Sequence, residues 1–311
     1  MQKQERRKTG LKASPRAPFE INGVMVPAGK LTQVELRLAR LPTGMWISLP
    51  VGVLHGRHEG PVIWVSAAIH GDELNGVPII RHLLDAVDPR RLSGTVLAVP
   101  VVNVQGLIQE SRYLPDRRDL NRCFPGSKRG SSAAQLAHLF MTEIVARCEL
   151  GLDLHTGSGG RTNLPQLRRD LDEPGTLRLV HEFGAPVLLH SRLRDGSLRA
   201  AARDLDKVVL VYEAGEASRF NNESIEMGVE GILRVMTSLG MIHDMVGPPK
   251  LAPRISRASS WLRARRRRDR SPVKAKSRGI VIGHVTSPIV HRGDAIAHIA
   301  EMPETVGSEG Q

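Results

Sequence analysis

Strongly apolar runs of strand length alternate with helical patterns through the middle of the chain, and this alternation limits the possible folds more than any other feature. The run at 61–69 (PVIWVSAAI) shows no polar alternation, as expected of a strand buried on both faces. Apolar residues then recur at helical spacing over 71–87. Two more apolar runs lie at 94–103 and 207–216. This order predicts an α/β fold with a mixed, largely parallel sheet flanked by helices.

Weaker signals fill in the remaining elements. The segment before 61–69 reads as an extended stretch from residue 44 that ends in a polar turn, HGRHEG. A short apolar run at 149–157 predicts another strand. Helices are expected at 132–148, 176–184, 198–204 and 225–239.

The composition of the sequence changes after residue 246, where Gly, Pro and a basic run precede short segments with strand-like patterns. We therefore expect three parts. Residues 1–20 would form a basic flexible tail and residues 21–246 an α/β domain. Residues 247–311 would form a small all-β domain with a basic loop at 263–278.

The positive charge of the chain is confined to two short segments. The sequence has 44 Lys and Arg against 32 Asp and Glu, a formal net charge of +12. The excess lies in residues 1–16 and 263–278, so the rest of the chain is close to neutral. Such segments can bind phosphate backbones, but neither carries the aromatic residues that stack on bases. A solvated tail and a solvated loop are favoured over a nucleic-acid interface.

Cysteine content and hydropathy point to the cytoplasm. Two cysteines, Cys123 and Cys148, cannot form a disulfide framework. The basic N-terminus has no apolar core of the kind that a secretory signal needs. Apolar runs fall well short of the roughly 20 residues that span a bilayer, so no membrane partner is expected.

Three of the predicted buried strands end in residues that can do chemistry. His70 and Glu73 follow the first strand in the motif HGDE, His155 ends another in DLHTG, and Glu213 ends a third in EAGE. Ligands of open α/β sheets bind at the carboxyl ends of strands. Two histidines and one glutamate are a known ligand set for catalytic zinc. The spacing therefore predicts a metal site at His70, Glu73 and His155.

A long loop between Gly106 and Gly130 supplies cations and an amide. Loops of this length are uncommon in compact domains and are often functional. It carries Arg112, Asn121 and Arg122, and a rigid guanidinium suits bidentate binding of a carboxylate.

Four motifs in this order, HGDE, RYxxDxxDLNRCFPG, DLHTG and EAGE, resemble the succinylglutamate desuccinylase/aspartoacylase family of zinc hydrolases. The resemblance runs from about residue 44 to 240 and implies a zinc carboxypeptidase-like fold. It implies one Zn²⁺ per chain, held by His70, Glu73 and His155.

The resemblance also assigns roles around the metal. Arg112 would polarise the scissile carbonyl, and Asn121 and Arg122 would hold a substrate carboxylate. Glu213 would be the general base, in preference to Glu216. Asp153 would orient a histidine ligand.

One departure leaves the substrate open. Family members that take acidic N-acyl amino acids use a tyrosine from the C-terminal β domain, but this chain has only Tyr113 and Tyr212. Arg199 or Arg203 could replace it. The tryptophans are expected to serve packing, namely Trp46, Trp64 and Trp261.

The resulting prediction is a zinc-dependent hydrolase that removes an acyl group from an N-acyl amino acid or a related small molecule. A metallocarboxypeptidase acting on short peptides would use the same ligand set, and ester hydrolysis stays open. The third and weakest reading is a nucleic-acid-binding protein with a vestigial zinc site. Oligomeric state is not readable from the sequence.

Overall fold

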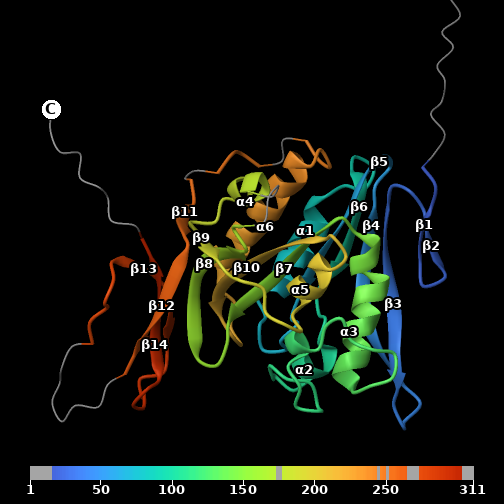
Figure 1. Ribbon diagram of the computed structural model, residues 1–311. Helices are drawn as coiled ribbons and strands as arrows, with labels where there is room; N and C mark the ends of the chain where they lie inside the picture. Colours follow the sequence, from blue (N-terminus) through green and yellow to red (C-terminus); the bar gives the residue numbers. More distant parts are fainter. Residues whose placement is uncertain (1–15, 173–176, 244–245, 250–251, 265–272, 303–311) are drawn as a thin grey trace, which may run out of the picture.

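A 12-stranded mixed sheet runs through the chain and positions the functional residues (Figure 1). The computed structural model describes residues 16–172, 177–243, 246–249, 252–264 and 273–302. Along the sheet the strands follow the order β3 (Lys30–Arg40), β4 (Trp46–His55), β6 (Ser93–Val99), β5 (His58–Ala67), β7 (Leu150–Gly157), β10 (Val208–Glu216), β8 (Arg161–Arg169), β13 (Gly279–Val285), β14 (Ala295–Glu301) and β12 (Ala258–Arg263).

The middle of the sheet is parallel, and it is built from the apolar runs of the sequence. Strands β6, β5, β7 and β10 pair in parallel in that order. Every residue of β7 is buried, including the polar Asp153 and His155, as expected of a strand that is covered on both faces. Parallel strands present their carboxyl ends at one edge, so this part of the sheet brings the HGDE, DLHTG and EAGE motifs together.

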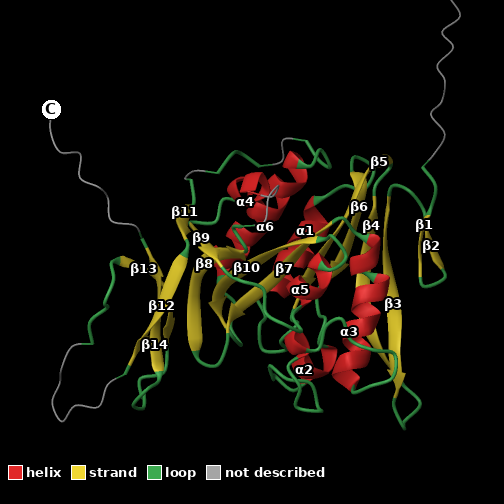
Figure 2. Ribbon diagram, viewed as in Figure 1, coloured by secondary structure: helices red, strands yellow, loops and turns green. Residues whose placement is uncertain are grey.

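Helices cover both faces of this central region (Figure 2). One apolar core cluster joins one face of the sheet to α1 (Gly76–Ala86), α4 (Leu177–Phe183) and α6 (Asn222–Ser238). A second cluster joins the opposite face to α3 (Ser132–Glu143) and α5 (Leu198–Arg203). Trp64 of β5 is fully buried in the second cluster, as predicted. Its indole lies where a Cβ on Gly151 of β7 would sit, 2.0 Å away, so only glycine fits there.

The N-terminal strands extend the sheet on one side. β1 (Phe19–Ile21) and β2 (Val24–Val26) form a small separate hairpin, and β3 pairs antiparallel with β4 at the edge of the main sheet. The sequence pattern predicts an extended segment in the β4 region but none of the three strands before it.

The C-terminal strands extend the same sheet on the other side. β8 runs antiparallel to β10 and is joined by β13, which is followed by β14 and β12. β9 (Val187–His190) and β11 (Arg254–Ser256) pair in parallel next to β8. The expected C-terminal β strands are present, and they are continuous with the α/β sheet through β13 and β8. The division into domains stays a prediction.

One helix boundary is corrected. The sequence pattern over 71–87 predicts a helix that includes the HGDE acids, but α1 begins only at Gly76. Residues 71–75 form an irregular connection instead. Ala68 just before it has a positive φ of 49°, which turns the chain sharply at the end of β5. Because Glu73 lies on this turn, its side chain can point back toward the end of the strand.

The long loop at 106–130 is partly structured. Short helices flank and interrupt it, namely α2 (Val104–Ile108) and η1 (Leu120–Arg122); a third, η2 (Val145–Arg147), follows α3. None of the described helices is both long and apolar enough to cross a membrane. The basic tail up to residue 15 and residues 265–272 of the basic loop lie outside the described residues, and the cytoplasmic location stays a prediction.

Candidate metal centre and active-site cavity

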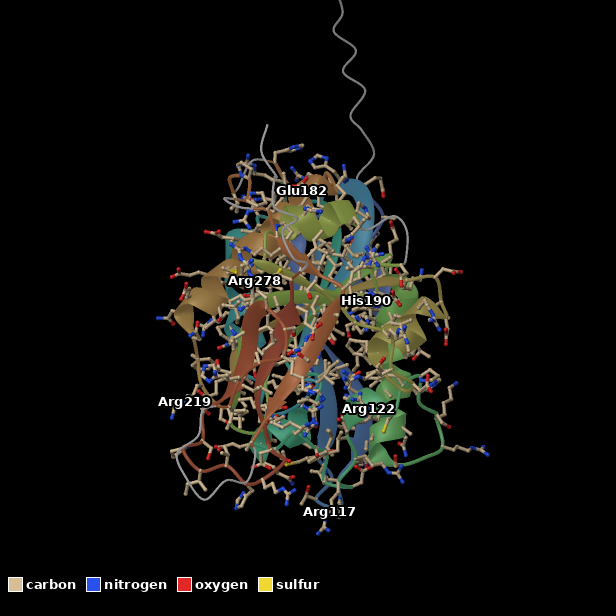
Figure 3. The ribbon with its side chains drawn as sticks, turned by 60° about the vertical axis from the view of Figure 1, so that its left-hand side comes forward. Arg117, Arg122, Glu182, His190, Arg219 and Arg278 are labelled. Carbon is tan, nitrogen blue, oxygen red and sulfur yellow. The ribbon has the colours of Figure 1, made fainter. Side chains whose placement is uncertain are left out.

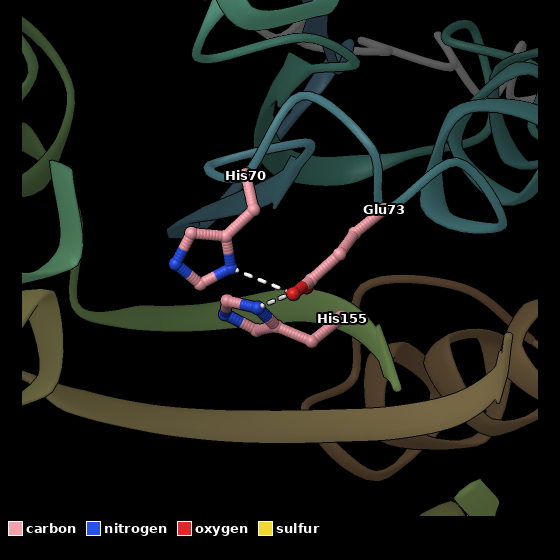
Figure 4. Close-up of side chains that lie close together, drawn as sticks. All are labelled: His70, Glu73 and His155. Carbon is pink, nitrogen blue, oxygen red and sulfur yellow. Dashed lines mark hydrogen bonds and ion pairs between the residues drawn. The ribbon is translucent and has the colours of Figure 1, made fainter. Parts of the chain in front are cut away.

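His70, Glu73 and His155 meet in a buried cluster at the carboxyl ends of β5 and β7 (Figure 4). Nδ1 of His70 lies 2.8 Å from Oε1 of Glu73, and Nδ1 of His155 lies 2.7 Å from Oε2 of the same carboxylate. One ligand atom from each residue lies within 4.8 Å of the others. Both imidazoles thus aim the same ring nitrogen at one carboxylate.

The opposite nitrogen of each imidazole is also held by a carboxylate. Nε2 of His155 lies 2.8 Å from Asp153, whose other oxygen accepts a hydrogen bond from Ser66. Nε2 of His70 lies 3.1 Å from Asp119. Carboxylates in these positions fix the ring orientation of metal-binding histidines and make them better ligands. The predicted role of Asp153 matches this placement, whereas the equivalent residue for His70, Asp119, was not singled out from the sequence.

The charges of the cluster perturb its ionisation strongly. Burial alone would raise the pKa of Glu73, but the two imidazoles outweigh burial and hold that pKa well below its usual range. Burial alone would lower the pKa of His155, but Asp153 and Glu73 raise it well above its usual value. The pKa of His70 is raised in the same way by Glu73 and Asp119. In the protein without metal, protons on the imidazoles therefore supply the positive charge among these carboxylates.

This donor set fits a divalent cation. With both imidazoles neutral, three carboxylates and the guanidinium of Arg112 leave two net negative charges around the cluster. A divalent ion would replace the imidazole protons and balance those charges. Two nitrogens and a carboxylate oxygen are the donors that zinc prefers in catalytic sites.

Close backbone packing holds the HGDE turn in place. A Cβ on Gly71 would lie 2.0 Å from the backbone of Gly106, so the turn and the start of α2 can approach only because residue 71 is glycine. On the other side, the Asn75 side chain donates to the carbonyl of Ala214 and accepts from the amide of Asn221. The turn is thereby tied to the strand that carries Glu213.

Arg112 bridges the metal cluster and the long loop. Its Nη1 lies 3.2 Å from Oε1 of Glu73, and its Nη2 lies 3.0 Å from Asp119. Asp119 therefore contacts both His70 and Arg112, and also caps the amide of Asn121. The carboxylate of Asp119 thus links the loop to the metal cluster.

A cavity of about 630 Å³ opens over the cluster. Its walls contain the three cluster residues, Asp153, Glu213, Tyr113 and Trp261. Six arginines also line it, namely Arg112, Arg122, Arg161, Arg168, Arg194 and Arg199. This excess of guanidinium groups favours a ligand that carries negative charge.

Glu213 lies on the wall next to the metal cluster. It pairs with His155 across the parallel β7–β10 ladder, so the two residues are direct neighbours at the sheet edge. Asn163 donates to its Oε2 at 2.7 Å, and Nη1 of Arg168 lies 3.3 Å from its Oε1. Glu216, the competing candidate, is not among the cavity residues and accepts a hydrogen bond from Thr286 instead.

The predicted carboxylate-binding residues Asn121 and Arg122 both line the cavity. The Asn121 side-chain oxygen accepts from the amide of Leu198 at the start of α5, so its Nδ2 is the group left for a ligand. Arg122 extends from the loop before α3, and Arg117 at the tip of the same loop points away from the molecule (Figure 3).

The two arginines considered as replacements for the missing tyrosine differ in position. Arg199 lines the cavity, with Nη2 donating to the carbonyls of Ser191 and Arg192 at 2.7 and 2.8 Å. Arg203 is not a cavity residue, and it pairs with Asp204. Tyr212 is buried, its hydroxyl donating to the carbonyl of Ser224.

Trp261 departs from the packing role expected of it. It lies on β12, is 42% exposed and lines the cavity. The C-terminal strands therefore contribute a side chain to the site. The polar strand β8, with Asn163 and Arg168, was missed as well, because a strand that lines a cavity lacks the apolar run by which buried strands are found.

A second group of possible ligands lies apart from the cavity. Asp170, Asp172 and His190 come close together, but Asp172 is exposed and the other two are only partly buried. The amide of Leu171 donates to Nδ1 of His190, and Arg257 pairs with Asp172. These contacts give the group an ordinary surface role.

Sequence comparison agrees with this site. The model of the succinylglutamate desuccinylase/aspartoacylase catalytic domain matches residues 59–239. This chain belongs to that family. The match contains all of the residues predicted for the metal site, for catalysis and for carboxylate binding, and it ends before the C-terminal strands.

Individual relatives are similar over part of their length. N-alpha-acetyl-L-2,4-diaminobutyric acid deacetylase from Halomonas elongata is 28% identical over 213 residues, which cover 65% of this chain and 61% of that protein. A protein named "Probable aspartoacylase" from Parasynechococcus marenigrum is 29% identical over 138 residues, 41% of this chain and 45% of that protein. The matched parts are thus less than two thirds of either relative.

The fold has close counterparts among solved structures. A succinylglutamate desuccinylase/aspartoacylase from Rhodobacter sphaeroides superimposes with a TM-score of 0.77 at 24% identity, covering 89% of this chain and 96% of that one. At this identity the likeness establishes the fold. The predicted fold class and family are confirmed.

Proposed function

We propose that this protein is a zinc-dependent hydrolase that removes the acyl group from an N-acyl amino acid or a related small molecule. The observation that carries the proposal is the cluster of His70, Glu73 and His155 at 2.7–2.8 Å contacts, with Glu213 beside it in the sheet. Named relatives act on N-acyl amino acids, which supports the choice of an acylated amine over a peptide.

His70, Glu73 and His155 would hold the metal. When bound, zinc lowers the pKa of a coordinated water toward about 7 and polarises a carbonyl oxygen. Asp119 and Asp153 would hold the two imidazoles with Nδ1 turned toward the ion. The chain thus supplies both the ligands and the groups that orient them.

Glu213 would move the proton. A carboxylate next to the metal can take a proton from the attacking water and return it to the leaving nitrogen. Asn163 and Arg168 hold this carboxylate in a defined orientation. Because Arg112 lies against Glu73, its guanidinium would stabilise the negative charge that develops on the substrate carbonyl oxygen.

Asn121 and Arg122 would fix the substrate by its carboxylate. The Asn121 oxygen is used to hold α5, so the amide nitrogen and the Arg122 guanidinium would act as donors. Binding through this carboxylate would direct the acylated nitrogen toward the metal and Glu213. Both residues come from the loop that Asp119 orders.

Metal content and hydrolysis test the proposal together. Purified protein is analysed for metals and assayed with N-acetyl and N-succinyl amino acids, alongside His155→Ala and Glu213→Gln. We expect about one zinc per chain in the wild type and in Glu213→Gln, and loss of zinc in His155→Ala. Both variants should lose hydrolysis. A folded, zinc-supplied protein that keeps no metal would contradict the proposal.

Dipeptides in the same assay separate the deacylase from a metallocarboxypeptidase. Faster release of amino acids from dipeptides than from N-acyl amino acids would favour the peptidase. The chemistry of the metal cluster is the same in both cases, so only the substrate comparison distinguishes them.

A further inference from the structure

A row of side chains crosses the four strands on the cavity side of the C-terminal region. Trp261 of β12 pairs with His298 of β14, His298 pairs with Gly283 of β13, and Gly283 pairs with Asn163 of β8. Residues paired directly across strands share one face of the sheet. Because Asn163 contacts Glu213, this row runs from the proposed catalytic base out to Trp261.

The outer end of the row is a layered stack. The His298 ring lies parallel to the Trp261 ring, 4.2 Å away at an interplanar angle of 6°. The Arg161 guanidinium carbon lies 5.6 Å from the centre of the Trp261 ring. A guanidinium over an aromatic face is attracted by the ring electrons. Trp261 is thus held by His298 and in turn holds Arg161.

Arg161 has no acidic partner among the described residues, as is also true of Arg122 and Arg194, but of these three only Arg161 lies over an aromatic ring. Arg112 pairs with Glu73 and Asp119, and Arg168 pairs with Glu213. Arg161 forms no ion pair with any residue that the structure describes, and its Nε is buried without a hydrogen bond there. A cation that lines a cavity, is fixed by an aromatic ring and lacks a counter-charge is suited to bind an anionic ligand group.

His298, which stacks on Trp261, adds no positive charge of its own next to Arg161. Burial and the nearby Arg168 and Arg194 lower the pKa of His298 to about 4, so His298 is neutral near pH 7. A neutral imidazole stacks on Trp261 without repelling Arg161. No acid of the cavity lies within ion-pair distance of Arg161 among the described residues.

We propose that Arg161, held flat against Trp261, is a specificity-determining residue that binds a second carboxylate of the substrate, distinct from the one held by Asn121 and Arg122. Trp261 is then a positioning residue supplied by the C-terminal strands. This inference rests on the proposed function for the identity of the substrate, but the anion site itself can be tested without turnover. It favours a substrate with two carboxylates over one whose side chain is cationic.

The test measures a preference ratio. Zinc-loaded protein is assayed with N-acetyl-L-alanine, which has one carboxylate, and with N-succinyl-L-alanine and N-acetyl-L-aspartate, which have two. The ratio of kcat/KM for two carboxylates to that for one is compared among wild type, Arg161→Met, Arg161→Lys, Trp261→Ala and Trp261→Phe. Arg37→Ala and Trp46→Ala are matched controls, because Arg37 lies 5.2 Å over Trp46 in an equivalent pair away from the cavity.

We expect the wild type to prefer at least one of the two-carboxylate substrates. Arg161→Met should lower the ratio about tenfold to a hundredfold, mainly through KM, since a hydrogen bond to a charged group is worth about that much. Trp261→Ala should also lower the preference ratio, although it removes no charge. Trp261→Phe and Arg161→Lys should keep part of the preference for two carboxylates. The two control variants should leave it unchanged.

Calorimetric binding to Glu213→Gln protein, with and without Arg161→Met, separates this inference from the proposed function. A binding preference for two carboxylates that depends on Arg161, together with a zinc-loaded wild type that hydrolyses none of the compounds, would support the anion site and reject the deacylase. Hydrolysis whose preference ratio stays within twofold in Arg161→Met would overturn the anion site and keep the deacylase. A wild type that binds or hydrolyses the one-carboxylate compound best would also overturn it.

Discussion

Two walls of the same cavity are built in different ways. The metal wall takes His70, Glu73 and His155 from the ends of parallel strands and from short motifs that are visible in the sequence. The opposite wall takes Asn163 and Trp261, with His298 stacked on Trp261, from three strands whose residues are far apart in the chain. Motifs therefore reveal the chemistry of the site, whereas strand register decides which groups surround the substrate.

Substitution of Glu213 should have the largest effect, because this residue joins the two walls. Glu213→Gln removes the proton acceptor but can keep hydrogen bonds to Asn163, so kcat should fall about a thousandfold with zinc content unchanged. Glu216→Gln is the matched control, three residues away and outside the cavity. Equal loss in both variants, measured by steady-state kinetics, would contradict the assignment.

A substitution at Asp119 should weaken metal binding although Asp119 is not one of the proposed metal ligands. Asp119→Asn removes the carboxylate that contacts both His70 and Arg112, and zinc affinity should fall roughly tenfold to a hundredfold. Competition with a metal indicator measures the affinity. Asp88→Asn, which changes a partly exposed acid paired with Arg90, serves as the control. An unchanged affinity in Asp119→Asn would show that the loop carboxylate does not support the ligands.

His298, which stacks on Trp261, should make the folding stability of the protein decrease at acidic pH. Since the pKa of His298 is lowered to about 4 in the folded state, between pH 6.5 and 4 the unfolded chain binds a proton that the folded protein does not. This contribution to stability is present above pH 6.5 and lost as the pH falls. At pH 5 the loss should be about 2 kcal/mol.

Urea unfolding at pH 7 and pH 5 measures that loss. His298→Gln removes the titrating group, so its stability should fall less than that of the wild type over the same pH interval. Identical pH dependence of the two proteins would rule out a depressed pKa at His298.

The smallest expected effect on stability comes from the glycine in the row. A Cβ on Gly283 would lie 2.7 Å from Oδ1 of Asn163 and 3.1 Å from the carbonyl of Thr162. Gly283→Ala should cost only about 1 kcal/mol, because the Asn163 side chain can move aside. That movement would disturb the contact with Glu213 and lower kcat about tenfold.

Gly247→Ala is the control for this substitution, since nothing lies within 4 Å of a Cβ there. Thermal unfolding and kinetics are measured on both variants. A kcat for Gly283→Ala that equals that of the control would show that the row does not position Glu213.

Sequence patterns predicted the parallel strands well and the polar strands poorly. The apolar runs at 61–69 and 207–216 became β5 and β10, because a strand buried on both faces must be apolar throughout. β8 reads RTNLPQLRR, and three of its polar side chains, Arg161, Asn163 and Arg168, line the cavity, so its sequence resembles that of a loop. The helix at 71–87 was placed too early because acids often occupy a first helical turn, whereas here Glu73 lies on a turn that precedes the helix.

The sequence by itself determined the family, the α/β class and the residues proposed to hold zinc, since each of these depends on short segments that can be recognised one at a time. Only the tertiary structure revealed that Asp119 supports His70 and that Trp261 reaches the cavity. The physical reason is that a cross-strand neighbour is fixed by register, and register depends on the pairing of the whole sheet. Residues such as Arg161 and Trp261, 100 positions apart, have no local pattern that joins them.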